Sequence, residues 1–328
     1  MFLDLQDVKT HFPITKGILT KKVVDCVKAV DGISLSIEKG EILGLVGESG
    51  CGKSTLSRTI MQLIPATGGD IILEGENLTR LSRNEVRKRR LDFQMIFQDP
   101  YASLNPRMTI FSTLSEALQQ RHPQLKGNKT ALMEAVVALM ERVGLNPSFM
   151  KKYPHEFSGG QRQRIAIARA LAPEPKLIIA DEPVSALDVT IQAQILDLLV
   201  RLRDEQGMGL VLITHDMGVV AETAERVQVQ YAGQKVEEQP VRDLFRTPCH
   251  PYTTALLSAR PERAMSKIWP SIPGVVRGQF DRPKGCLFSP RCSHADATCL
   301  QNPPLPKTKA FGKARCHHVE TIAQGAGA

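Results

Sequence analysis

The chain has 328 residues, of which 42% are hydrophobic and 23% are charged. This length predicts one large domain or two modest ones, and the composition is that of a globular protein with a buried core, which excludes a fibre or a disordered tail. No apolar stretch approaches the roughly 20 residues of a membrane-spanning helix, and the N-terminus lacks the basic and apolar regions of a secretory signal. We therefore expect a cytosolic chain without a membrane span.

The excess positive charge lies entirely in the last 90 residues. Residues 1–238 contain 29 basic and 29 acidic side chains, whereas residues 239–328 contain 13 and 5, so that 13 − 5 accounts for the whole net charge of +8. The second stretch also holds 11 of the 21 prolines and five of the seven cysteines. We predict a main domain at residues 1–238 and a loop-rich, basic extension at residues 239–328.

The main domain is predicted to be α/β with a largely parallel sheet, because apolar strands alternate with helical patterns. A helical region at about residues 99–157 is predicted to be inserted into this core. The individual elements expected, in chain order, are a strand at 41–46, a helix at 54–63, a helix at 130–143 that ends before Gly144, a helix at 165–171, a strand at 177–180 and a strand at 210–214.

A phosphate-binding loop is predicted between the first strand and the first helix. Residues 47–55 read GESGCGKST, which fits the pattern G-x-x-x-x-G-K-S/T in its usual strand–loop–helix context. Glycines let successive backbone N–H groups converge on phosphate oxygens, Lys53 can bridge the β- and γ-phosphates, and Ser54 can ligate Mg²⁺. A glycine-rich turn without function is the alternative. The residues expected to contact the nucleotide are Gly47, Glu48, Ser49, Gly50, Cys51, Gly52, Lys53, Ser54 and Thr55, with Cys51 as a small filler.

Two adjacent acids follow the apolar strand at 177–180. Asp181, at the carboxyl edge of the strand, can hold Mg²⁺, and Glu182 can polarise an attacking water. Two acids after a strand are also common as plain solvated residues. The phosphate loop in the same chain favours the catalytic interpretation.

A second candidate anion site lies at the start of a predicted helix. Ser158, Gly159, Gly160 and Gln161 combine a serine cap with paired glycines, which would expose backbone N–H groups. An ordinary capped helix is the alternative. One ATP needs only the cradle of its own phosphate loop, so a second cradle suits a nucleotide held by another subunit. With Phe157 in the first place, this motif resembles the Leu-Ser-Gly-Gly-Gln signature of the ATP-binding-cassette (ABC) ATPases.

The resemblance extends to the other motifs of the family, in the family's order. It implies that Gln98 senses Mg²⁺ and begins the helical insertion, that the loop ending at Asp188 crosses a dimer interface, and that His215 contacts the γ-phosphate. The implied catalytic residues are Glu182, His215 and Gln98, and the implied Mg²⁺ ligands are Ser54, Gln98 and Asp181.

One feature of the family is missing upstream of the loop. These ATPases usually stack adenine on an aromatic side chain about twenty to thirty residues before the loop lysine. Here that stretch offers Val23, Val24, Asp25 and Cys26, and Phe12 lies further upstream. The residue that stacks on adenine is therefore not predicted.

The extension resembles that of ATPases serving bacterial peptide and nickel importers, most closely the dipeptide type. The resemblance rests on the sequence HPYT at residues 250–253 and on the spacing of the cysteines. It implies an ATPase on the cytoplasmic face of the bacterial inner membrane that powers import of dipeptides or short oligopeptides. The implied partners are a second homologous ATPase, two integral-membrane permease subunits and an extracytoplasmic peptide-binding protein. Nickel or another solute is the alternative, because other subunits select the solute.

A soluble cassette ATPase acting on DNA or ribosomes is the alternative from another class. Such proteins tend to carry coiled-coil or zinc-finger insertions between the phosphate loop and the signature, or two cassettes in one chain, whereas Lys53 and Ser158 are 105 positions apart and one cassette is present. The basic run at residues 87–90 has no interleaved aromatic side chains. We expect no nucleic-acid partner.

Four cysteines of the extension are candidate metal ligands, because clustered cysteines in a cytosolic chain are more often ligands than disulfides. Cys286, Cys292, Cys299 and Cys316 have 5, 6 and 16 residues between them, without the close Cys-x-x-Cys pair usual for structural zinc. Four thiolates can hold a 4Fe-4S cluster, and the family resemblance also points to iron-sulfur. The alternatives are free thiols, or zinc with a further ligand from His294, His317 or His318.

Overall fold

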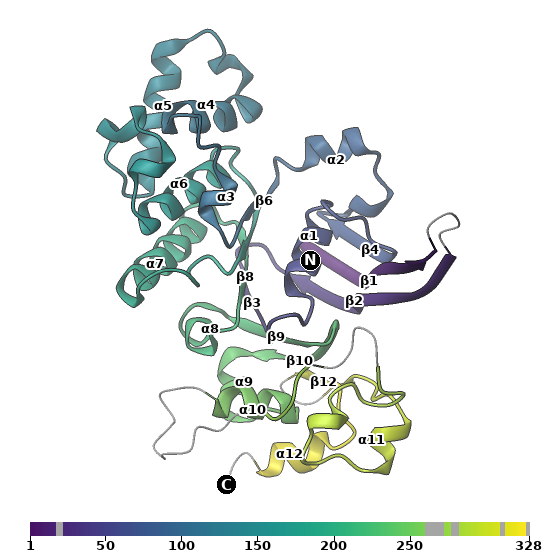
Figure 1. Cartoon of the computed structure of the whole chain (residues 1–328). Coiled ribbons are helices and arrows are strands. Elements are labelled where there is room, and N and C mark those ends of the chain that lie inside the picture. The colour runs from purple at the N-terminus through teal and green to yellow at the C-terminus, as the bar shows by residue number, and fades with distance from the viewer. Residues whose placement is uncertain (18–21, 260–271, 277–281, 309–311, 326–328) are drawn as a thin grey trace. The chain divides into compact units, whose positions relative to one another are not determined.

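The computed structural model describes residues 1–17, 22–259, 272–276, 282–308 and 312–325 (Figure 1). Its contacts divide the chain into two compact units. Unit 1 consists of Met1–Glu38, Ile42–Arg80 and Thr214–Ala328, and unit 2 of Lys39–Glu41 and Leu81–Ile213. The extension thus belongs to the same unit as the phosphate loop. The predicted boundary at residues 238/239 falls within strand β10 (Gln234–Pro240) of unit 1 and stays a prediction.

Unit 1 contains an antiparallel sheet of the order β2-β1-β4-β5 and a second group of strands. The antiparallel sheet is formed by β1 (Leu3–Lys16), β2 (Lys22–Ile37), β4 (Gly68–Leu73) and β5 (Glu76–Asn77). In the second group β3 (Ile42–Val46) pairs parallel with β9 (Arg226–Tyr231), followed antiparallel by β10, β12 (Lys313–Ala314) and β11 (Lys307–Thr308). The helices are α1 (Lys53–Ile60), α8 (Met217–Thr223), α9 (Val241–Arg246), α10 (Pro251–Ser258), α11 (Ala297–Gln301) and α12 (Val319–Gly325), with short 3-10 helices η1 (Leu78–Arg80) and η6 (Ser289–Arg291).

Unit 2 combines parallel strands with helices. Its strands, in the order β6-β7-β8, are β6 (Phe93–Ile96), β7 (Leu177–Asp181) and β8 (Gly209–Thr214). Its helices are α2 (Arg83–Arg89), α3 (Pro100–Ser103), α4 (Ile110–Arg121), α5 (Lys129–Arg142), α6 (Gly159–Leu171) and α7 (Val189–Gln206), with η2 (Pro123–Leu125), η3 (Pro147–Lys151) and η4 (Pro154–Glu156). From Pro100 to Glu156 every regular element is helical.

The prediction of a largely parallel sheet was incomplete. The buried strand β3 pairs parallel with β9 in unit 1, and the buried strand β7 pairs parallel with β6 in unit 2, in line with the continuous apolar sequences of β3 and β7. The long pair β1 and β2 was missed and is antiparallel. Its register shifts at several points, and residues 22–25 are exposed, so the pair shows neither a regular alternation nor an apolar run.

The extension shares a hydrophobic core with the rest of unit 1. The rings of Tyr231 on β9 and Tyr252 on α10 have centroids 4.7 Å apart, and both side chains are fully buried. Phe288, from the cysteine-rich part, lies 5.3 Å from Tyr231 and 5.4 Å from Tyr252. These edge and tilted contacts anchor the extension in unit 1.

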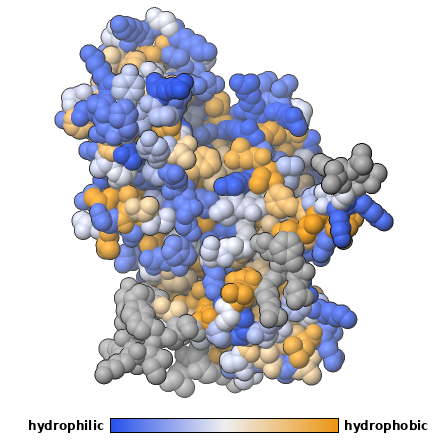
Figure 2. All heavy atoms as spheres, viewed as in Figure 1, coloured by the Kyte–Doolittle hydropathy of each residue, from blue (hydrophilic) through white to orange (hydrophobic). Residues whose placement is uncertain are grey.

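Within the described residues no helix is long and apolar enough to cross a membrane. On the face drawn in Figure 2, hydrophobic residues are scattered among hydrophilic ones.

Candidate functional site

The predicted site residues are distributed over both units. Unit 1 holds residues 47–55 and His215, and unit 2 holds Gln98, residues 158–161 and the acids from Asp181 to Asp188. The cysteines of the extension lie in unit 1.

The phosphate loop of unit 1 joins the buried strand β3 to helix α1 through glycines that no other residue could replace. Gly47 and Gly52 have φ of 153° and 102°. A Cβ at Gly47 would lie 2.2 Å from the Gln230 carbonyl oxygen, and one at Gly52 would lie 2.0 Å from that of Ala29. At both positions the loop therefore packs directly against neighbouring backbone, which leaves no room for a side chain.

Lys53 begins α1, and its side chain is folded back into the loop. The residue is only 5% exposed, and its Nζ donates to the carbonyl oxygens of Gly47 at 2.6 Å and Glu48 at 3.1 Å. Cys51 is buried beside it, with Sγ 3.7 Å from Nζ. Burial raises the pKa of the Cys51 thiol, which fits the predicted role of a filler rather than a reactive thiol.

The acids of unit 2 lie at the end of β7. Asp181 is the last residue of this strand and is 4% exposed. Glu182 follows with a φ of 47°, and its N–H donates to the Ile213 carbonyl oxygen at 2.9 Å. A left-handed backbone at a glutamate costs of order 1–3 kcal/mol, and such strain is concentrated at functional sites.

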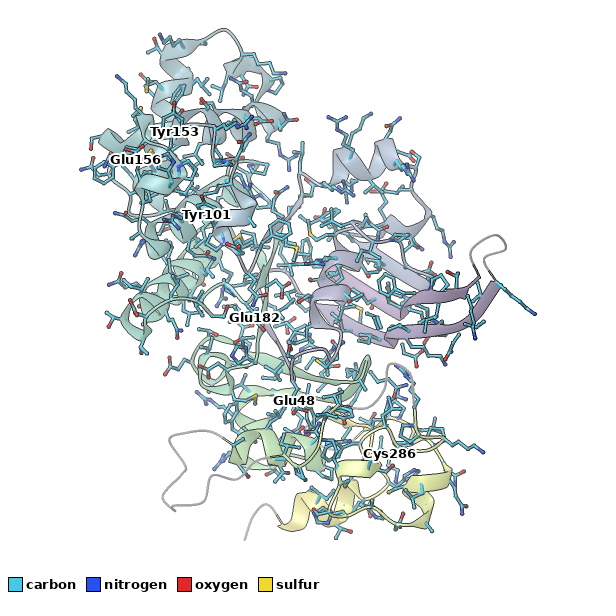
Figure 3. All side chains as sticks on the ribbon, in the orientation of Figure 1. Glu48, Tyr101, Tyr153, Glu156, Glu182 and Cys286 are labelled. Atoms are coloured by element: carbon cyan, nitrogen blue, oxygen red, sulfur yellow. The ribbon has the colours of Figure 1, made fainter. Side chains whose placement is uncertain are left out.

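Gln98 and Glu182 meet although they are 84 positions apart. The Gln98 side-chain amide donates to a Glu182 carboxylate oxygen at 2.9 Å (Glu182 is labelled in Figure 3). Parallel pairing of β6 with β7 brings the carboxyl ends of these strands together, which explains the contact.

The signature residues of unit 2 form the N-terminus of α6. The Ser158 Oγ accepts from the Gln161 N–H at 3.3 Å, and the Gln161 side chain accepts from the Ser158 N–H at 3.1 Å, which is a complete capping box. Ser158 and Gly159 are exposed. A Cβ at Gly160 would lie 2.6 Å from Ile191 Cγ2 on α7, so packing explains this glycine.

The remaining motif residues are accessible. His215, which follows β8, is exposed. Asp188 is also exposed and stands at the N-terminus of α7 without a side-chain capping bond. Of the residues considered for adenine stacking, Phe12 is 40% exposed on β1, opposite Val27 of β2.

The four candidate cysteines, Cys286, Cys292, Cys299 and Cys316, form no disulfide with any described residue. Cys299 and Cys316 are buried, and Cys286 and Cys292 are half-buried. Burial raises the pKa of Cys316 to about 11, against a hydrogen bond from the His318 backbone N–H that lowers it; negative charge on the other three cysteines acts in the same direction as burial. The Cys286 N–H also donates to the Cys299 carbonyl oxygen at 2.7 Å. Among the described residues, the candidate ligand atoms found within 4.8 Å of one another are those of Asp296, Cys299 and His318, which include one of the four cysteines.

One histidine lies beside Cys299. The Nε2 of His318 lies 3.5 Å from Cys299 Sγ and 3.3 Å from an Asp296 carboxylate oxygen. The Nε2 of His317 instead contacts the Asn302 carbonyl oxygen at 2.9 Å. Among the histidines considered from the sequence, His318 is thus placed beside a candidate ligand.

Sequence motifs did not reveal the contacts that surround Glu48. Its carboxylate is paired with Arg291, and its N–H donates to the Tyr252 hydroxyl, both from the extension. The partners are 243 and 204 positions away, so no local spacing could have indicated them.

The loop, the acids and the signature define an ABC ATPase, and the chain belongs to the ABC transporter family. A family profile described as ABC transporter matches residues 30–185. A second, described as the C-terminal region of oligopeptide/dipeptide transporters, matches residues 236–299. The predicted family, the predicted α/β fold of a P-loop ATPase and the predicted activity are confirmed: the protein is an ATP-hydrolysing enzyme.

The particular group within the family is that of the peptide transport ATP-binding proteins. The oligopeptide transport ATP-binding protein AppF of Bacillus subtilis is 47% identical over 319 residues, covering 94% of each chain. OppF of Salmonella typhimurium, with the same description, is 46% identical and covers 98% of this chain and 97% of its own. The dipeptide transport ATP-binding protein DppF of Haemophilus influenzae is 42% identical, covering 95% of both.

Solved structures give the same fold. A dimeric ATP-binding cassette in a post-hydrolysis state, bound to ADP and Pi, matches 73% of this chain and 99% of its own, with a TM-score of 0.63 and 29% identity. CbiO1 of Clostridium perfringens, part of the ABC transporter complex CbiONQ, matches 74% of this chain and 90% of its own, with a TM-score of 0.64 and 26% identity.

Proposed function

We propose that this ATPase powers the import of dipeptides or short oligopeptides through a separate membrane permease. The observation that carries the proposal is the second profile match, at residues 236–299, which adds a peptide-transporter region to the general cassette. The proposed partners are a second homologous ATPase, two permease subunits and an extracytoplasmic peptide-binding protein. The chain would work at the cytoplasmic face of the inner membrane as a peripheral protein.

The proposed roles follow the chemistry of each side chain. The loop at residues 47–55 binds the phosphates of ATP, with Lys53 and His215 contributing charge and hydrogen bonds at the γ-phosphate. Glu182 accepts a proton from the attacking water, and Gln98 orients its carboxylate. Ser54, Asp181 and Gln98 would hold Mg²⁺, which offsets phosphate charge when bound.

The signature residues are proposed to serve the nucleotide of the partner ATPase. The exposed N-terminus of α6 offers backbone N–H groups and a partial positive charge to an anion. Asp188 would lie at the same interface between subunits. In this arrangement the anion at the N-terminus of α6 is the triphosphate held by the partner ATPase, whereas this chain's own phosphate loop binds a separate ATP.

The cysteines are proposed to hold a 4Fe-4S cluster through Cys286, Cys292, Cys299 and Cys316. A cluster bound there would crosslink segments of an extension that has many prolines and little regular structure. Zinc is the competing ligand, and a contact favours it as the second candidate: His318 lies beside Cys299.

Transport assays in proteoliposomes test the function. The chain would be assembled with permease subunits and a second ATPase from the same organism, and ATP turnover would be measured with binding protein loaded with a dipeptide, with Ni²⁺, or with neither. We expect stimulation and uptake with the dipeptide. The Lys53→Ala variant should abolish hydrolysis at this chain's own site. Stimulation by Ni²⁺ alone would replace the proposed solute.

Anaerobic purification tests the metal group. We expect brown protein with broad visible absorption that bleaches on reduction and about four irons per chain. Cys292→Ser should remove the colour, whereas Cys26→Ser, which changes a cysteine outside the cluster, should not. Colourless protein with one zinc would support the competing ligand, and metal-free protein with reactive thiols would contradict both.

A further inference from the structure

The extension holds one residue of the phosphate loop from two sides. The Arg291 guanidinium makes a two-point ion pair with Glu48, with Nη1 2.7 Å from Oε2 and Nη2 3.0 Å from Oε1 (Figure 3 labels Glu48). The Glu48 N–H donates to the Tyr252 hydroxyl at 2.8 Å. Two-point pairs of this kind fix orientation as well as distance.

Both anchors are themselves held firmly. The Arg291 side chain is only 4% exposed, and its Nε donates to the Pro273 carbonyl oxygen at 2.7 Å. The hydrogen bond with Glu48 raises the pKa of Arg291, so the guanidinium stays charged. Tyr252 is fully buried against Tyr231 and Phe288. Neither anchor can follow a shift of the loop without disturbing the core.

Glu48 passes this constraint on to the lysine of the loop. Its carbonyl oxygen accepts from Lys53 Nζ at 3.1 Å and from the Cys51 N–H at 3.3 Å. The N–H, the carbonyl oxygen and the carboxylate of Glu48 are therefore all engaged. If the Glu48 carboxylate moves, the Glu48 carbonyl oxygen, which accepts from Lys53 Nζ, is displaced with it.

We propose that Arg291 is a positioning residue for ATP binding: it fixes Glu48, and through Glu48 it presets the phosphate loop. Without Arg291, the Glu48 carboxylate would lose its cation in a partly buried place next to the site of a triphosphate. Its negative charge would then oppose the phosphates, and the loop would lose part of its preset conformation. The inference rests on the proposed role of the loop, and the tests below separate the two.

The experiment is a double-mutant cycle on the full-length chain, with the Kd of MgATP as the measurement. Arg291→Gln should weaken binding roughly tenfold, and Arg291→Lys should have a smaller effect because it keeps the charge but loses the two-point geometry. Glu48→Gln with Arg291→Gln should bind better than Arg291→Gln alone, since the uncompensated charge is gone. In the assembled transporter, Arg291→Gln should raise the KM for ATP with little change in kcat.

A matched control exists in the same extension. Arg282 pairs with Asp31 at 2.5 Å, a partly buried ion pair that does not involve residues 47–55. Arg282→Gln should leave the Kd of MgATP unchanged. An equal loss in Arg282→Gln would show general loosening and overturn the proposal, as would normal binding by Arg291→Gln. If Arg291→Gln fails to fold, Arg291→Lys and the double variant decide in the same way. Normal MgATP binding by Lys53→Ala would contradict the role of the loop instead.

Discussion

Glu182 combines a strained backbone with a hydrogen bond from Gln98, and both features bear on its chemistry. Glu182→Gln should retain MgATP binding and reduce turnover by about 10²–10⁴-fold, because an amide cannot accept the proton of water. Single-turnover hydrolysis in the assembled transporter is the measurement. Glu174→Gln is the matched control, a glutamate of the same unit with a φ of 50° and no predicted role. Wild-type hydrolysis by Glu182→Gln would exclude it as the base.

Site residues that are adjacent in the sequence could be predicted from it, and contacts between distant residues could not. The loop before Lys53 and the adjacent acids Asp181 and Glu182 are short sequence patterns. Their placement, at the start of helix α1 and at the end of strand β7, could therefore be predicted from neighbouring residues. The contact of Glu48 with Arg291 joins segments 243 positions apart and depends on how the core of unit 1 packs. Spacing along the chain carries no information about such a contact.

The packing of α6 on α7 depends on a missing side chain at Gly160. A Cβ there would lie 2.6 Å from Ile191 Cγ2, so Gly160→Ala should lower the free energy of unfolding by about 1–3 kcal/mol despite the better helix propensity of alanine. Gly159→Ala is the control, since its Cβ would lie 3.4 Å from Leu187 Cδ2. Urea unfolding gives both values. Ile191→Ala should rescue Gly160→Ala, and absence of rescue would contradict the clash.

Helix α10 depends on a neutral histidine at its start. His250 is 1% exposed, and its Nδ1 accepts from the Tyr252 N–H at 3.1 Å. Burial lowers its pKa from 6.5 to about 3, against a hydrogen bond with the Arg315 backbone. A lowered pKa means that the stabilisation is complete above pH 6.5 and is lost as the pH falls, by about 2 kcal/mol at pH 5.

Glu237, which is buried beside His250, has the opposite effect on the pH dependence of stability. Burial raises the pKa of Glu237 from 4.5 to about 6, so its protonation stabilises the fold as the pH falls and offsets about 1 kcal/mol at pH 5. The test is therefore best made in the Glu237→Gln variant, which lacks this opposing titration. In it, hydrogen exchange of α10 should be faster at pH 5 than at pH 7, after correction for intrinsic rates. His250→Asn keeps a capping acceptor without the titration and should remove this dependence.

For the whole chain, composition and alternating patterns identified an α/β protein with a distinct basic extension, and the family profiles agree with this class. The pattern did not indicate that residues after 239 pack into the same unit as β1 to β4. Proline-rich, irregular segments carry no periodicity, and Phe288 enters the aromatic core through tertiary contacts alone. The extension therefore looked more separate in the sequence than its packing makes it.

The assembly of two ATPases is the remaining prediction, and Gly159→Asp addresses it. An acid in the first turn of α6 suits the helix dipole, and its Cβ would make only an ordinary contact with Leu187, so the chain should fold and its own Kd for MgATP should not change. In the assembled transporter, the same carboxylate would face the partner's triphosphate, and like charges should reduce turnover at that site by at least tenfold. Gly159→Ala controls for the added volume. Unchanged turnover in Gly159→Asp would mean that the signature residues serve only as a helix cap.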